Sequence, residues 1–227
     1  LNWRLLLDGP ASGPWNMAAD ACLLEQSQVP TLRLYAWQGP WLSLGYSQSV
    51  DWLRPLPWDH LQVGRVRRPT GGRAVLHHQE ITYAVVLPTA EGSVAQVYRM
   101  ITGWWLDCLA ALGYPVGQLE ESARSSGHPS CYQLGQAGEV AVEGRKFVGS
   151  AQLRRGSRVL QHGSLPLAVD EELFRVFFGE ACLPACLPGL RPEALVSHFP
   201  QRLMADSWSP EELERIAVSC EEYQCPL

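Results

Sequence analysis

The chain has 227 residues, of which 46% are hydrophobic and 18% charged, and its formal net charge is −5. This composition is typical of a globular protein with a sizeable core, and the negative charge argues against a nucleic-acid binder. No apolar run is long enough to span a membrane and the first residues do not resemble a secretory signal, so we expect a cytoplasmic protein that does not insert into membranes.

The charge is unevenly distributed along the chain. Residues 65–158 hold eleven Arg and Lys against seven Asp and Glu, whereas the remainder holds seven against sixteen. We therefore expect the middle of the chain to face an acidic partner or ligand. The seven cysteines, an odd number, predict free thiols instead of a disulfide framework, and no His accompanies them at a spacing typical of a metal site.

Hydrophobic periodicity and turn residues predict a mixed α+β protein. For the first half we expect strands at 3–9, 31–37, 41–46 and 80–88, helices at 14–26 and 93–113, a short helix and loop at 50–60, and a strand, turn and strand over 65–77. For the second half we expect a polar loop at 118–130, strands at 131–135, 139–144, 145–155 and 158–169 joined as a meander, and helices near 170–178 and 209–223.

A glycine-rich turn lies in the segment "RRPTGGRAVLH", residues 67–77. Gly71 and Gly72 allow a backbone to approach a ligand closely, and their N–H groups can hold an oxygen atom. The arginines Arg67, Arg68 and Arg73 flank them. The alternative reading is a plain hairpin turn with arginines on the surface.

Cys131 and Lys146 are the two residues whose chemistry stands out. Cys131 is predicted between a polar loop and a strand, where a thiol can face a cleft, although an inert, half-buried thiol is the alternative. Lys146 is the only lysine beside seventeen arginines. It follows Cys131 by fifteen residues across a turn at Glu143, so both side chains can share one cleft. A compact ammonium there would favour a thiolate and could donate to an oxyanion.

The histidines give a weaker signal. His77 and His78 follow the glycine turn, and His162 lies in "LQHGSL". No carboxylate is spaced around them as in a catalytic triad, so a hydrogen-bonded structural role is the simpler interpretation.

Three segments together resemble the biotin and lipoate protein ligase and octanoyltransferase superfamily. They are "NMAADACLLE" near the start, "RRPTGGRAVLHHQEITYAVVLP", and "VEGRKFVGSAQLRRGSRVLQHGSL". The resemblance implies an α+β fold with a mixed, largely antiparallel central sheet flanked by helices, similar to class II aminoacyl-tRNA synthetases and biotin synthetases. It implies one catalytic domain over residues 1–227, with its core at about 28–205 and no C-terminal accessory domain.

Within this superfamily, "SCYQLG" followed by "GRK" is similar to the cysteine-dependent octanoyltransferases of the LipM type. In that subfamily the cysteine carries the acyl group as a thioester, and the lysine lowers the pKa of the cysteine. The resemblance thus implies that Cys131 is the nucleophile and that Lys146 supports it and polarises the carbonyl. His78 stands where the family pattern has Asp, and the residues after Cys131 also depart from it, which puts substrate preference in doubt.

The reaction that the resemblance implies is transfer of octanoyl from acyl carrier protein to the lysine of a lipoyl domain, such as glycine cleavage H protein or a 2-oxoacid dehydrogenase E2, without metal, nucleotide or other cofactor. Alternatives are an ATP-dependent lipoate or biotin ligase, an amidotransferase between lipoyl domains, and a silent binding module. We expect apolar strand residues near Val75 and Val85 to line the acyl channel. The expected substrate-binding residues are Arg68, Thr70, Gly71, Gly72, Arg73, His77, Gly149, Ser150, Ala151, His162 and Gly163.

Overall fold

The centre of the protein is a six-stranded mixed sheet with strand order β10-β11-β6-β2-β1-β12. The structure, a computed structural model, describes residues 2–119, 128–133, 138–179 and 183–226. β10, β11, β6 and β2 are antiparallel neighbours, whereas β1 is parallel to β2 and to β12, which confirms the predicted mixed, largely antiparallel sheet. The strands are β1 (Trp3–Ala11), β2 (Thr31–Trp37), β6 (Glu80–Leu87), β10 (Gly149–Arg155), β11 (Arg158–Pro166) and β12 (Leu203–Ala205).

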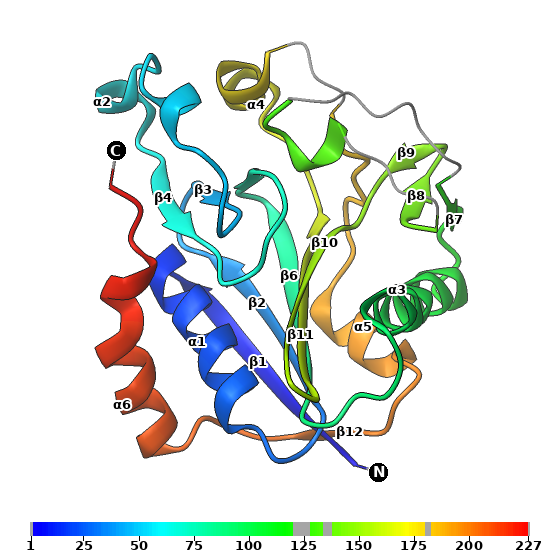
Figure 1. Cartoon of the computed structure of the whole chain (residues 1–227). Helices are drawn as coiled ribbons and strands as arrows, with labels where there is room; N and C mark the ends of the chain where they lie inside the picture. The colour runs from blue at the N-terminus through cyan, green and yellow to red at the C-terminus, as the bar shows by residue number, and fades with distance from the viewer. Residues whose placement is uncertain (1, 120–127, 134–137, 180–182, 227) are drawn as a thin grey trace.

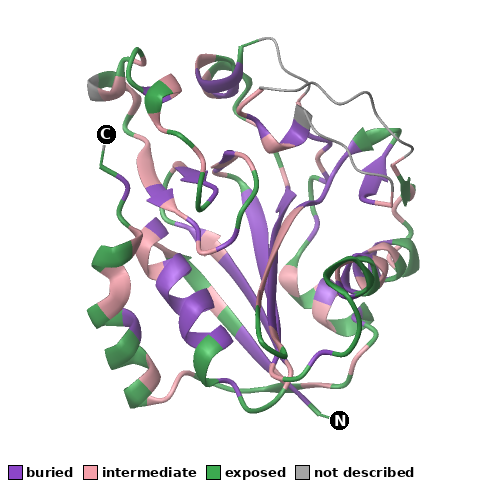
Figure 2. Ribbon diagram, in the orientation of Figure 1, coloured by how far each residue is buried: buried purple, intermediate pink, exposed green. Residues whose placement is uncertain are grey.

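Helices cover both faces of this sheet (Figure 1). One face carries α1 (Gly13–Gln26) and α6 (Pro210–Ser219), and the other carries α3 (Val94–Ala111) and α5 (Pro192–His198). Side chains of Ser12, Ser93 and Ser209 cap the N-termini of α1, α3 and α6 by accepting backbone hydrogen bonds. Because these helices lie on both sides, all eight residues of β6 are buried, and the central strands are the most buried part of the chain (Figure 2).

The alternation of β6 separates two core clusters. Tyr83 and Val85 pack toward α3 with Trp105, whereas Ala84 and Val86 pack with Met17 and other residues of α1. The prediction that Val85 lines an acyl channel is therefore wrong, because its side chain belongs to the core beneath α3.

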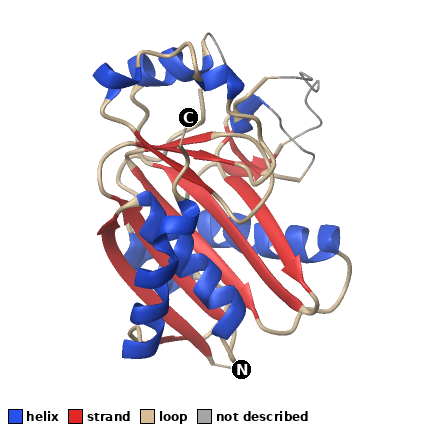
Figure 3. Ribbon diagram, turned by 60° about the vertical axis from the view of Figure 1, so that its left-hand side comes forward, coloured by secondary structure: helices blue, strands red, loops and turns tan. Residues whose placement is uncertain are grey.

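Two small sheets and several short helices gather at one end of the long strands (Figures 1 and 3). In the first small sheet, β3 (Trp41–Leu44) lies between β4 (Gly64–Arg67) and β5 (Val75–His77). The second contains β7 (Val116–Gln118), β8 (Val140–Val142) and β9 (Arg145–Lys146). The short helices are η1 (Asp51–Leu53), α2 (Trp58–Leu61), η2 (Cys131–Gln133), α4 (Glu171–Phe178) and η3 (Cys220–Tyr223).

Two local predictions are wrong. The predicted strand 145–155 is divided: β9 ends at Lys146 in a small sheet, and β10 begins at Gly149 in the main sheet. Phe147 and Val148 are both buried where the chain passes between the sheets, so strict alternation is lost there. The predicted strand 131–135 begins instead as η2, and residues 134–135 lie outside the described residues. Most of the predicted polar loop, at 120–127, also lies outside them.

Other elements follow the prediction or add to it. The helix expected near 170–178 is α4, and the one expected near 209–223 is α6 followed by η3. The elements α5, β7 and β12 were not predicted; they are short and gain their stability from packing against neighbours. Within the described residues six cysteines are free thiols, and no helix has the length and hydropathy to cross a bilayer.

Candidate active site

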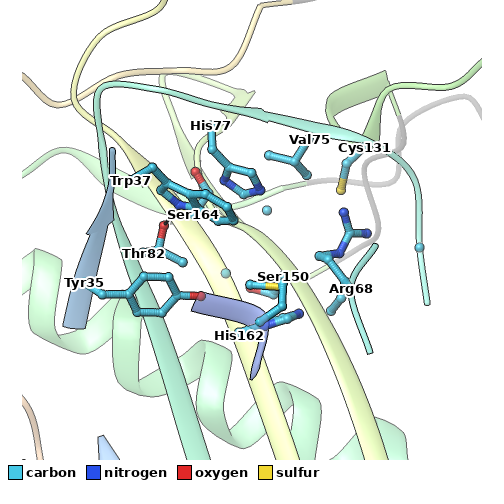
Figure 4. A pocket seen from close by; sticks show the side chains of 15 residues that line it. Tyr35, Trp37, Arg68, Val75, His77, Thr82, Cys131, Ser150, His162 and Ser164 are labelled. Carbon is cyan, nitrogen blue, oxygen red and sulfur yellow. Dashed lines mark hydrogen bonds between the residues drawn. The ribbon is translucent and has the colours of Figure 1, made fainter. Parts of the chain in front are cut away.

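An inner cavity lies where the glycine-rich segment, η2, the start of β10 and the second half of β11 meet (Figure 4). Its lining residues are Met17, Tyr35, Trp37, Arg68, Gly72, Val75, His77, Thr82, Cys131, Gly149, Ser150, Ala151, His162, Gly163 and Ser164. The cavity thus has apolar and aromatic walls with a few polar groups between them.

An outer cleft lies against this inner cavity. It is lined by Gly71, Gly72, Arg73, Val94, Ala95, Tyr98, Arg99, Cys131, Gly138, Glu139, Lys146, Ser150, Ala151 and Gln152. Cys131 lines both spaces, as do Gly72, Ser150 and Ala151. A group on the Cys131 sulfur can therefore extend inward, while a second reactant reaches the sulfur from the outer cleft.

The position of Cys131 depends on the segment after the glycine turn. The Cys131 N–H donates to the Ala74 carbonyl at 2.9 Å, and the Ala74 N–H donates to the Pro129 carbonyl at 2.9 Å. A hydrogen bond from the Tyr132 N–H to Ser130 Oγ begins the single 3-10 turn of η2. The bonds to Ala74, the residue before β5, join the cysteine to the end of the glycine-rich segment and hold the two together.

Lys146 is buried beside Cys131 and is ion-paired. Its Nζ lies 3.8 Å from Cys131 Sγ and donates to the Cys131 carbonyl at 3.3 Å. It also lies 2.9 Å from Glu139 Oε2 and 3.0 Å from Glu139 Oε1. Burial lowers the pKa of Lys146, but Cys131 and the Glu139 carboxylate outweigh burial and leave the pKa raised. Lys146 therefore stays protonated and acts as a donor and a positive charge.

Glu139 is a site residue that the sequence analysis missed. Its carboxylate accepts from Tyr98 OH at 3.1 Å as well as from Lys146. A sequence signal did exist: Ala141 pairs with Lys146 across the turn at Glu143, and Glu139 lies two residues before Ala141 on the same face. Burial raises the pKa of Tyr98, with Glu139 adding to it, so the phenol stays neutral.

Arg68 is buried in the wall of the inner cavity, only 6% exposed. Its Nη1 donates to the backbone carbonyl and the hydroxyl of Ser43, and its Nη2 donates to the carbonyls of Gly71 and Arg73. The guanidinium thus holds the glycine-rich segment against β3. Burial lowers the pKa of Arg68 to about 10, and Cys131 opposes this effect most strongly.

The glycine-rich segment is not a hairpin turn. β4 and β5 do not pair with each other, because each pairs with β3 from opposite sides. Gly72 adopts φ +96°, and a Cβ at Gly45 would lie 2.0 Å from the Gly72 carbonyl oxygen. The hairpin reading with surface arginines is therefore wrong: Arg68 is buried, and Arg67 is half-buried and donates to carbonyls of Gly45, Tyr46 and Gln48.

Both cavity histidines are fully engaged in hydrogen bonds. His162 donates from Nδ1 to Asp20 Oδ2 at 2.8 Å, so its Nε2 accepts from the Thr70 hydroxyl at 2.7 Å. Burial lowers the pKa of His162, and its imidazole is neutral. His77 stacks on Trp37 at 4.0 Å and lies 2.7 Å from Glu80 Oε1 and 2.6 Å from Ser43 Oγ. Both imidazoles are positioned as structural supports of the cavity.

The structure brings the predicted site residues together around Cys131. Among these residues, Thr70 does not line the inner cavity but is hydrogen-bonded to His162, which does. The other predicted residues line the inner cavity, the outer cleft or both. His78 lines neither. Asp20 was also missed; it joins Arg33, Tyr35 and His162 beneath the cavity. Its spacing from these partners in sequence gives no signal, because the contacts cross three elements.

Comparison with known proteins adds an independent finding. Residues 12–181 match the model of the lipoyl protein ligase A/B catalytic domain family. The chain is 40% identical over 213 residues to octanoyltransferase LipM of Symbiobacterium thermophilum, covering 87% of this chain and 75% of that protein. It is 39% identical over 194 residues to octanoyltransferase LipM of Bacillus cereus, covering 77% of this chain and 69% of that protein.

Solved structures resemble the fold at lower sequence identity. A lipoate-protein ligase A bound with ATP superposes with a TM-score of 0.80 at 18% identity, covering 98% of this chain and 95% of that one. A putative lipoate protein ligase from Thermoplasma acidophilum with bound lipoic acid gives a TM-score of 0.78 at 19% identity, covering 98% and 96%. At this identity the likeness concerns the fold alone.

Proposed function

The chain belongs to the lipoyl protein ligase A/B catalytic domain family and is an octanoyltransferase, and we propose that it transfers octanoyl from acyl carrier protein to the lysine of a lipoyl domain through a thioester on Cys131. The observation that supports the thioester is the place of Cys131, which lines both the inner cavity and the outer cleft beside a protonated lysine. An acyl chain and an incoming reactant can then meet at one sulfur.

The first half-reaction forms the thioester. The Cys131 thiolate attacks the carbonyl carbon of the octanoyl thioester on the carrier, and the resulting tetrahedral oxyanion collapses as the bond to the carrier sulfur breaks. The carrier thiolate leaves through the outer cleft and takes a proton from solvent. The octanoyl chain stays in the inner cavity, against walls that include Met17, Trp37 and Val75.

The second half-reaction forms the amide. The neutral ε-amine of the acceptor lysine enters the outer cleft and attacks the carbonyl of the Cys131 thioester. The carbon–sulfur bond breaks, Cys131 returns as a thiolate, and the amine nitrogen loses a proton to solvent. The two reactants occupy the same cleft in turn, so the proposed kinetics are ping-pong.

Three groups are placed to stabilise the oxyanion. Lys146 is a protonated donor 3.8 Å from the Cys131 sulfur. Gly71 and Gly72 line the outer cleft, and within the described residues their N–H groups donate to no other group. Donors that are already positioned contribute strongly to the rate when charge develops on the carbonyl oxygen. The route requires no metal or nucleotide.

The test is the intact mass of the protein after incubation with octanoyl-acyl carrier protein and no acceptor. We expect an added octanoyl group in the natural protein and none in Cys131→Ser. Cys108→Ser is the matched control, because burial raises the pKa of that thiol to about 11 and keeps it protonated. An adduct of full yield in Cys131→Ser would show that another thiol is the nucleophile.

The same incubation separates the alternative reactions. An octanoylated lipoyl domain in place of the carrier tests amidotransfer, and ATP with free lipoate tests ligation. Pyrophosphate release with free lipoate would favour a ligase over the transferase. Binding of carrier or lipoyl domain with no adduct from any donor would indicate a binding module.

A further inference from the structure

Arg68 carries a buried charge with no carboxylate in contact. Its four Nη hydrogens bind three backbone carbonyls and one hydroxyl, all neutral. Within the part of the chain that the structure describes, no carboxylate lies within 4.0 Å of its guanidinium. The other buried arginine near the site, Arg33, lies 2.6 Å from Asp8 and 2.7 Å from Asp20. Buried charges are normally paired in this way, so Arg68 requires a compensating anion.

The nearest carboxylate along its hydrogen bonds is two groups away. Ser43 Oγ accepts from Arg68 Nη1 at 2.8 Å and lies 2.6 Å from His77 Nε2. His77 Nδ1 then donates to Glu80 Oε1 at 2.7 Å. Glu80 thus lies at the end of the chain of hydrogen bonds that holds Arg68, and Ser43 and His77 separate it from the guanidinium.

Cys131 is the group that faces Arg68 across the inner cavity. In Figure 4 the Arg68 guanidinium points toward the Cys131 sulfur, and both residues line the cavity. The electrostatic coupling agrees: burial lowers the pKa of Arg68, and Cys131 is the strongest influence that raises it. A thiolate at Cys131 would supply the anion that Arg68 lacks.

The charge of Lys146, in contrast, is already opposed. Glu139 lies 2.9 Å from Lys146 Nζ, closer than the 3.8 Å to the Cys131 sulfur. Among the described residues, Cys131 also influences Tyr98 and Tyr132, whose pKa values are raised, mainly by burial, so both stay neutral. The Lys146–Glu139 pair itself therefore presents little net charge to Cys131. Arg73 and Arg99 also line the outer cleft, whereas Arg68 is the arginine that lines the inner cavity.

We propose that Arg68 is a second cation of the reaction, which holds the Cys131 thiolate from the inner cavity and steadies the oxyanion when the acyl group is bound. Lys146 acts from the outer side as a hydrogen-bond donor whose charge is shared with Glu139. The inference rests on the proposed role of Cys131 as nucleophile, and it adds an electrostatic partner that the lysine alone does not provide.

The test measures thiolate formation without any donor substrate. Iodoacetamide alkylation of Cys131 is followed from pH 5 to 10 and assigned by peptide mass spectrometry. We expect Arg68→Met to slow alkylation at pH 7 about tenfold and to move the pH profile upward by about one unit, because one unit corresponds to a factor of ten. Arg68→Lys should stay within about threefold of the natural protein, since it keeps the charge.

Arg67→Met is the matched control. Arg67 is the preceding residue, but its guanidinium donates to carbonyls of Gly45, Tyr46 and Gln48 and it does not line the inner cavity. Its alkylation profile should remain that of the natural protein. An unchanged profile in folded Arg68→Met would overturn the proposal. Equal slowing in Arg68→Met and Arg68→Lys would also overturn it, because shape and hydrogen bonding, not charge, would then be the cause.

If Arg68→Met does not fold, a second variant tests whether Arg68 holds the Cys131 thiolate. Lys146→Met combined with Glu139→Gln removes the outer ion pair as a unit and leaves no unpaired carboxylate behind. We expect Cys131 in this variant still to alkylate at pH 7 well above the rate of a free cysteine peptide, because Arg68 remains. A fall to the rate of a free cysteine peptide would contradict the proposal. Since alkylation needs no octanoyl donor, these outcomes are separate from failure of octanoyl transfer itself.

Discussion

Lys146 is the single lysine beside seventeen arginines in this chain, and its surroundings suggest why. Lys146 is 7% exposed, and its ammonium lies within 3.8 Å of a carboxylate, a carbonyl and a sulfur. A compact point charge can meet all three, whereas a planar guanidinium presents its donors as a fixed fork. The composition of the chain drew attention to this residue, and the geometry gives the reason for lysine.

Lys146→Arg should therefore keep the fold and lose rate. We expect octanoyl transfer to slow by about tenfold to a hundredfold, because the longer fork displaces donors from the reacting carbonyl. The measurement is the single-turnover rate of adduct formation on Cys131, with circular dichroism as the check on folding. Turnover close to normal would mean that only the positive charge at this position matters.

Glu139→Gln should lower stability more than an ordinary surface change. It leaves Lys146 buried without its carboxylate, and breaking one side of a buried pair costs about 3 kcal/mol or more. The free energy of unfolding in urea measures the loss. Glu143→Gln is the control: Glu143 is exposed on the turn of the same β8-β9 hairpin, and its replacement should cost less than about 0.5 kcal/mol. Similar losses in both variants would mean that the ion pair adds little.

At the scale of elements, the sequence predicted the helices and strands that depend on a local pattern of residues. The β-branched and aromatic residues of β6 are visible in the chain, as are Ser93 at the start of α3 and Gly113 after its end, and both elements were found from them. The division between β9 and β10 was missed, because Phe147 and Val148 look like strand residues and their burial depends on two sheets at once. Cys131 was identified from the sequence by the chemistry of a thiol near a lysine. The 3-10 turn that holds it was not predicted, because it depends on hydrogen bonds to Ala74, a residue remote in sequence.

The close approach of β10 and β11 at the cavity gives a prediction about Gly163. A Cβ there would lie 2.7 Å from Tyr83 Cε1, 2.8 Å from the Gly149 carbonyl oxygen and 2.9 Å from Ser150 Oγ. We expect Gly163→Ala to cost about 1 to 3 kcal/mol through overpacking and to reduce adduct formation, because Gly149 and Ser150 line the inner cavity.

The control for this change is Gly117→Ala, also at a strand glycine. A Cβ at Gly117 in β7 would meet nothing within 4 Å, so its unfolding free energy should change by less than about 0.5 kcal/mol. Thermal and urea unfolding of both variants provide the comparison. A Gly163→Ala protein as stable and active as Gly117→Ala would show that the strands can separate at this point without consequence.

At the scale of the whole molecule, the uneven charge of the chain coincides with the outer cleft. Residues 65–158 carry the net positive charge, and two of their arginines, Arg73 and Arg99, line the cleft through which reactants reach Cys131. The rest of the chain is acidic. Carrier proteins are acidic as well, so the approach of the proposed donor should be favoured at this cleft and opposed elsewhere.

Arg99→Gln tests this steering. Arg99 is exposed on α3 at the cleft, so its loss should lower kcat/KM for octanoyl-acyl carrier protein by about threefold to tenfold at low salt. The difference should shrink as NaCl rises above about 0.15 M, where exposed charges are screened beyond about 8 Å. Octanoyl-pantetheine, a small uncharged donor, should show neither effect. Arg155→Gln is the control, because Arg155 ends β10 and pairs with Glu25 instead of facing the cleft. An equal loss with both donors would place Arg99 in the chemistry at Cys131 instead of in donor approach.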